Sequence, residues 1–142
     1  MKKILGLDLG SKTIGIAISD KLGFIASTYK TIFFEEGNSL TSLEELKEII
    51  KKEEVSKIVL GFPKNMNNSI GPRAEESIKF KKILEDELNI EVILEDERWT
   101  TVQANRVLID ANVSRKKRKT KVDKLAATYI LQSYLDKNRK ED

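Results

Sequence analysis

Residues 4–19 read ILGLDLGSKTIGIAIS, two apolar segments separated by a Gly-Ser-Lys-Thr turn. Each segment has the length and the leucine and isoleucine content of a buried strand. Asp8 lies inside the first segment, although acidic residues are depleted in strands and an unpaired buried carboxylate costs several kcal/mol. A compensating interaction is therefore required, and we expect Asp8 to be a functional residue rather than a structural one.

The rest of the chain predicts alternating strands and helices. Short connections join strands 3–9, 14–19 and 24–34, so these three should form an antiparallel meander. A capping box at Thr41–Glu44 predicts the start of the first helix, and Pro72 suits the first turn of the second. The later elements follow from apolar spacing: a helix to Ile50, a strand over 57–62, a helix over 71–88, a strand over 91–94, and helices over 101–111 and 122–136.

This order, β-β-β-α-β-α-β-α-α, predicts an α/β fold. Strands separated by single helices should be parallel, with right-handed crossovers. We therefore expect a five-stranded mixed sheet with helices on its faces. The length of 142 residues suits one domain, covering residues 1–142.

The composition excludes several kinds of chemistry. The chain contains no histidine and no cysteine, which removes Ser-His-Asp and Cys-His arrangements, histidine metal sites and thiolate zinc sites. Catalysis must then use carboxylates, lysine, arginine, hydroxyls, backbone amides or a bound metal. No apolar run is long enough for a membrane span, and the first residues lack the apolar core of a signal peptide, so we expect a cytoplasmic protein.

Three carboxylates are expected to meet at one edge of the sheet. Asp8 and Glu97 lie at the carboxyl ends of the first and fifth strands, where ligands collect in open α/β sheets. Asp123 borders the apolar face of the last helix. Acids this close repel one another unless a cation binds them, and oxygen-only ligands select Mg²⁺ or Mn²⁺. Two such ions about 4 Å apart would suit in-line cleavage of a phosphodiester.

Each acid outside the first strand also has a structural interpretation. Thr120 and Asp123 could form a capping box at the start of the last helix. Asp96 and Glu97 could complement the dipole of the helix that follows them.

Two basic segments could contact phosphates. Residues 115–121, RKKRKTK, place six cations in a predicted loop just before Asp123. Such a run is either a solvated face or a clamp on nucleic acid. Residues 64–74, KNMNNSIGPRA, add Lys64 and Arg73 beside amides at a helix start, which suit an anion, although a plain surface connection would have the same composition.

Four segments together, GLDLGSKTIGIAISD, LGFPKNMNNSIGPRAE, DERWTTVQA and SRKKRKTKVDKLAATYILQSYLD, resemble the YqgF (RuvX-like) family over nearly the whole chain. Members of that family are described as Holliday junction resolvases and as pre-16S rRNA nucleases. The resemblance implies an RNase H-like fold, with Asp8, Glu97 and Asp123 as catalytic acids for divalent metal. It also places Lys12, Arg73, Arg98 and the basic run around the nucleic-acid path.

The acids and the resemblance together predict a nuclease that uses Mg²⁺ or Mn²⁺, with two ions. The resemblance implies structured RNA as the substrate, at the 5′ end of pre-16S rRNA. Branched DNA is the alternative substrate, and the expected state is a monomer or weak homodimer with no membrane partner. A non-catalytic RNA-binding module and a sugar-kinase or actin-like ATPase are rival interpretations. The expected nucleic-acid contacts are Lys12, Lys64, Arg73, Arg98, Arg115, Lys116, Lys117, Arg118, Lys119 and Lys121.

Overall fold

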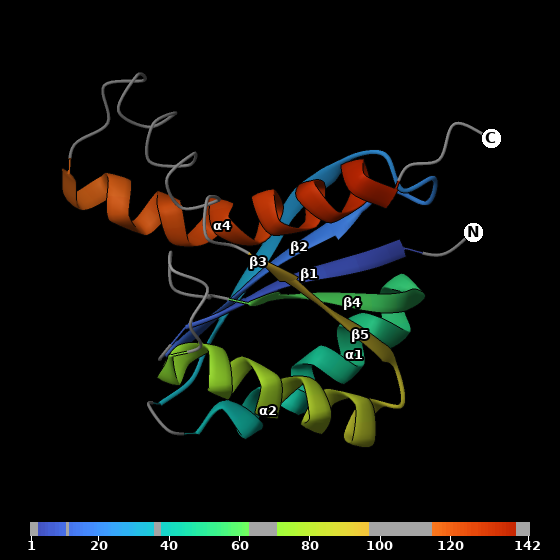
Figure 1. The fold of residues 1–142 in the computed structure, drawn as a ribbon, viewed down its shortest axis with the longest axis horizontal. Coiled ribbons are helices and arrows are strands. Elements are labelled where there is room, and N and C mark those ends of the chain that lie inside the picture. The colour runs from blue at the N-terminus through green and yellow to red at the C-terminus, as the bar shows by residue number, and fades with distance from the viewer. Residues whose placement is uncertain (1–2, 11, 36–37, 63–70, 97–114, 139–142) are drawn as a thin grey trace.

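A five-stranded mixed sheet forms the centre of the structure, with strand order β3-β2-β1-β4-β5 (Figure 1). The strands are β1 (Lys3–Leu9), β2 (Thr13–Ser19), β3 (Ala26–Phe33), β4 (Val55–Phe62) and β5 (Glu91–Asp96). β1, β2 and β3 pair antiparallel, whereas β4 pairs parallel with both β1 and β5. Both the meander and the parallel strands predicted from the sequence are confirmed.

The structure is a computed structural model that describes residues 3–10, 12–35, 38–62, 71–96 and 115–138. At positions 39, 72, 73, 96 and 115–124 the description is limited to the backbone. The helix predicted over 101–111 lies outside the described residues. Among the helices described, none is long and apolar enough to cross a membrane.

Helices cover both faces of the sheet (Figure 1). On one face lie α1 (Leu43–Glu53), which follows the short 3₁₀ helix η1 (Ser39–Ser42), and α2 (Pro72–Leu88). The other face is covered by α4 (Arg115–Asn138). Side chains alternate across a strand, so each strand contributes residues to two separate cores.

The larger core lies between the sheet and helices α1 and α2. It contains Leu5 and Leu7 of β1, Leu46 of α1, and Phe80 and Leu84 of α2, all nearly or fully buried. The smaller core lies under α4, where Ala17 and Val59 of the sheet meet Ala127, Ile130 and Leu131 of the helix. The small residues on both sides allow α4 to lie close to the strands.

The structure corrects two predicted boundaries near the N-terminal half. β3 begins at Ala26 rather than at residue 24, because the Asp20 carboxylate accepts hydrogen bonds from the amides of Phe24 and Ile25 and holds them in the turn. The capping box is wrong: α1 begins at Leu43 after η1, without a side-chain cap. The Thr41 hydroxyl instead donates 2.8 Å to the Asn38 carbonyl.

The largest correction concerns the basic segment. Residues 115–121 are not a loop, because α4 begins at Arg115 and runs unbroken to Asn138. Lysine and arginine are good helix formers, and the run contains no glycine or proline to end a helix. Thr120 and Asp123 therefore lie within a helix, and the capping-box interpretation of Asp123 is wrong.

Candidate functional site

Asp8 lies one residue before the end of β1, directly opposite Gly15 of β2. Its neighbours Leu7 and Leu5 belong to the core under α1 and α2, so alternation places Asp8 on the α4 face with Gly6. The residue is half-buried. Because Gly15 has no side chain, the carboxylate is not covered by its neighbour on β2.

The carboxyl ends of three parallel strands meet at the same edge as Asp8. The register pairs Leu7 with Leu60 of β4, and Leu60 with Leu94 of β5. Asp8 is therefore level with Glu95, and their Cα atoms lie about 10 Å apart across two strand spacings. β5 continues to Asp96, two residues further than predicted. Glu97 follows directly in sequence and lies outside the described residues.

α4 packs directly on β1 at Gly6, and its hydrogen bonds to β3 give its direction. A Cβ placed on Gly6 would lie 2.6 Å from the Cβ of Leu131 and 3.0 Å from the carbonyl oxygen of Ala127. The helix runs antiparallel to β3, since Gln132 Oε1 accepts from the amide of Ala26 at 2.9 Å and Thr128 hydrogen-bonds Thr28 at 3.0 Å. β1 and β3 both pair antiparallel with β2, so they run in the same direction. The N-terminal half of α4 is therefore directed toward the carboxyl end of β1.

Asp123 lies one turn before Ala127 on this N-terminal half. Its position along α4 is thus on the Asp8 side of the Gly6 crossing. α4 and the strands diverge toward that end (Figure 1). The backbone of α4 thus places Asp123 toward the end of β1 that carries Asp8. Only the backbone of Asp123 is described. The convergence of Asp8, Glu97 and Asp123 stays a prediction.

The predicted cationic residues are only partly within the description. Lys12 is exposed in the turn between β1 and β2. Arg73 lies in the first turn of α2, described by its backbone alone. The same holds for six residues in the first two turns of α4: Arg115, Lys116, Lys117, Arg118, Lys119 and Lys121. Lys64 and Arg98 lie outside the described residues.

Sequence reasoning missed a buried carboxylate on β5. Glu95 is only 5% exposed, and its Oε2 accepts a 3.0 Å hydrogen bond from the Ser133 hydroxyl and forms a 2.6 Å ion pair with Lys137. These contacts attach β5 to the C-terminal half of α4. The alternation from Ile93 to Glu95 was the available signal, but the strand was predicted to end at Leu94. We assign Glu95 to this contact between β5 and α4, because a cation and a hydroxyl already bind its carboxylate.

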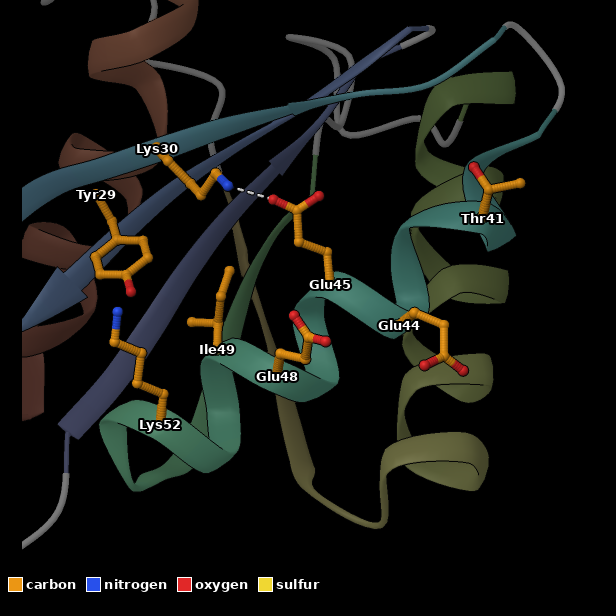
Figure 2. A pocket seen from close by; sticks show the side chains of 8 residues that line it. All are labelled: Tyr29, Lys30, Thr41, Glu44, Glu45, Glu48, Ile49 and Lys52. Atoms are coloured by element: carbon orange, nitrogen blue, oxygen red, sulfur yellow. Dashed lines mark hydrogen bonds and ion pairs between the residues drawn. The ribbon is translucent and has the colours of Figure 1, made fainter.

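A surface pocket of about 510 Å³ lies on the opposite face of the sheet from Asp8, between β3 and α1 (Figure 2). Its lining includes Tyr29 and Lys30 from β3 and Glu44, Glu45 and Glu48 from α1. Lys30 forms an ion pair with Glu45, which raises the pKa of Lys30. Because this charge is already paired and Asp8 is on the α4 face, we do not assign the pocket to the site.

The described side chains contain no group of three acidic, histidine or cysteine residues that could hold a metal. Two of the three predicted ligands have no described side chain. The three predicted ligands, Asp8, Glu97 and Asp123, offer only carboxylate oxygens, since the chain has no histidine or cysteine. Ligands of this kind suit Mg²⁺ or Mn²⁺.

Solved structures with the same architecture include two proteins in complex with a Holliday junction. Fowlpox virus resolvase, solved with Holliday junction DNA, matches with a TM-score of 0.58 and 17% identity over 97% of this chain and 99% of its own. RuvC from T. thermophilus, in complex with a Holliday junction substrate, matches with a TM-score of 0.55 and 9% identity over 96% of each chain. At these identities the likeness concerns the fold, and it confirms the predicted RNase H-like architecture.

Close relatives extend the comparison to sequence. Over 134 residues, a protein of Geobacillus sp. (strain WCH70) is 56% identical, and one of Bacillus subtilis (strain 168) is 53% identical. Both alignments cover 94% of this chain and 97% of the relative, and both relatives carry the name "Putative pre-16S rRNA nuclease". The family model described as "RuvX: Holliday junction resolvase" matches residues 2–137. The chain therefore belongs to the RuvX family.

Proposed function

We propose that this chain is a metal-dependent nuclease that hydrolyses structured RNA, and that its substrate is the 5′ end of pre-16S rRNA. The observation that carries the proposal is the position of Asp8, a half-buried acid on the α4 face at the carboxyl end of β1. The names of its close relatives support pre-16S rRNA as the substrate.

In this proposal Asp8, Glu97 and Asp123 hold Mg²⁺ or Mn²⁺, which supplies Lewis-acid stabilisation of charge on the phosphate. Glu97 also orients the attacking water. Hydrolysis joins the water oxygen to phosphorus and breaks one ester P–O bond, and the leaving oxygen ends with a proton. The basic first turns of α4 bind substrate phosphates on either side of the cleaved bond.

The first test is Asp8→Asn, which keeps the size of the side chain and removes its charge. Cleavage of a pre-16S 5′-end RNA in Mg²⁺ should fall about 100-fold or more, since several kcal/mol of stabilisation is removed. RNA affinity should change little. Asp86→Asn, an exposed acid on α2, is the matched control and should cleave normally. If Asp8→Asn cleaves at the wild-type rate, the proposed site is wrong.

Cleavage of four-way DNA is the second candidate function, favoured by the description of the family model and by the fold shared with Holliday junction resolvases. A matched pair of substrates, the RNA above and a synthetic four-way junction, separates the two in Mg²⁺ and Mn²⁺. Preferential RNA cleavage supports the first proposal, and preferential junction cleavage supports the second. Binding without cleavage of either substrate would indicate a non-catalytic RNA-binding module.

A further inference from the structure

Phe33 is an exposed aromatic residue at the same end of the sheet as Asp8. The residue is 77% exposed, more than any other large hydrophobic residue in the described part of the chain. It is the last residue of β3 and pairs with Thr13 of β2. A single exposed apolar residue is common on protein surfaces, so it is the position of Phe33 beside Asp8 and Lys12 that points to a function.

The register places Phe33 on the Asp8 face. Ile32, its neighbour, is buried in the core under α1 and α2, so Phe33 points to the α4 side. Asp8 pairs with Gly15, and Gly15 pairs with Thr31, two residues before Phe33. Strand spacing and rise then put the Cα atoms of Asp8 and Phe33 about 12 Å apart.

Backbone hydrogen bonds hold Phe33 beside a lysine. The amide of Phe34 donates 2.9 Å to the carbonyl of Lys12, and the amide of Gly10 donates 2.7 Å to the carbonyl of Thr13. These bonds join the end of β3 to the turn that follows β1. Phe33 is therefore positioned by the sheet, and the exposed Lys12 lies in the adjoining turn.

The side-chain hydrogen bonds described between α4 and β3 lie at the start of the strand, away from Phe33. The helix contacts β3 at Ala26 and Thr28, and toward its basic N-terminal turns it diverges from the strands (Figure 1). This end of the sheet therefore combines an exposed ring, a nearby lysine and a helix that begins with six cationic residues. Surfaces that bind single-stranded nucleic acid use the same components, because bases stack on aromatic rings and cations bind phosphates.

We propose that Phe33 is the stacking platform for an unpaired base of the substrate, roughly two to four nucleotides from the phosphate at Asp8. This inference rests on the proposed nuclease function and adds a requirement: the RNA is single-stranded beside the cleavage point. Phe33 is a binding and positioning residue, and it does not take part in the chemistry.

The test uses a hairpin RNA with a single-stranded 5′ extension that carries the fluorescent base 2-aminopurine at successive positions. In the Asp8→Asn background, which keeps the RNA intact, Phe33→Ala should weaken binding roughly 5- to 150-fold. It should also remove the fluorescence quenching that stacking causes at one position. Phe33→Tyr should retain both properties, and Phe33→Leu should lose the quenching.

Phe24→Ala is the matched control, because Phe24 is also exposed, at 44%, but lies in the turn before β3 at the other end of the strand. It should bind like the parent protein. If Phe33→Ala binds and quenches normally while the wild type cleaves RNA, the platform is wrong and the nuclease proposal stands. A wild type that neither binds nor cleaves the RNA overturns both. A Phe33→Ala effect on oligomeric state alone, measured by light scattering, would assign this face to self-association and overturn the platform.

Discussion

At the scale of single residues, Gly6 sets how closely α4 approaches the sheet. A methyl group there would overlap the Cβ of Leu131 at 2.6 Å and press on the backbone oxygen of Ala127 at 3.0 Å. Neither atom is the free end of a flexible side chain, so the helix itself would have to move. We expect Gly6→Ala to lower the free energy of unfolding by about 1–3 kcal/mol or more, measured by urea denaturation.

Gly23 provides the control for this substitution. It lies in the turn between β2 and β3 with φ of +77°, and a Cβ there would have no atom within 4 Å. Gly23→Ala should therefore cost only the backbone strain of a left-handed alanine, about 1–2 kcal/mol, without moving α4. The distinguishing measurement is RNA cleavage, which should fall in Gly6→Ala because the helix carrying Asp123 shifts. Normal cleavage by a destabilised Gly6→Ala would contradict this coupling.

At the scale of elements, Glu53 connects α1 to two strands. Its carboxylate accepts a 2.9 Å bond from Lys3 of β1 and a 3.0 Å bond from the Tyr29 hydroxyl of β3. The Lys3 bond, followed by the Tyr29 bond, lowers the pKa of Glu53. Burial first, and the bond to Glu53 second, raise the pKa of Tyr29.

The lowered pKa of Glu53 predicts a pH dependence of stability. The native state holds the glutamate charged to lower pH than the unfolded chain does, so this stabilisation is complete above the ordinary glutamate pKa of about 4.3 and disappears as pH falls through the native value. Glu53→Gln should flatten the unfolding free energy in that acidic range. Glu76→Gln, exposed on α2, should leave the profile unchanged. Identical acid profiles for wild type and Glu53→Gln would disprove the contribution.

The elements also show what the sequence could predict. β1, β2 and the start of α2 at Pro72 follow from local patterns, since apolar runs and a proline at the first turn report local geometry. The start of α4 did not, because the charge of residues 115–121 suggested a loop while helix propensity decided the outcome. Glu95 was missed because the strand was expected to end at Leu94, and its partners Ser133 and Lys137 come from a helix distant in sequence.

The candidate site divides in the same way. Asp8 could be recognised from sequence because an acid in an apolar strand is locally unfavourable. Phe33 could not, since its exposure depends on the path of α4, which no local pattern reports. Its register with Thr13 fixes its face of the sheet, but that pairing is a property of the assembled strands.

At the scale of the whole molecule, the charge is nearly balanced at +3, so binding a polyanion depends on where the cations lie. Six of them occupy the first two turns of α4. Replacing Arg115, Lys116, Lys117 and Arg118 with glutamine keeps good helix formers and removes four charges. We expect the dependence of log Kd for RNA on log salt to become shallower, by about 0.7 for each phosphate that the variant no longer neutralises.

The control variant loses the same number of positive charges from α1 and α2. Its four replaced residues are the exposed lysines Lys47, Lys51, Lys79 and Lys82, and this replacement should leave the slope unchanged. Because counterion release weakens as salt rises, the affinities of the α4 variant and wild type should converge at high ionic strength. Equal slopes for the two quadruple variants would mean that net charge, and not the start of α4, attracts the RNA.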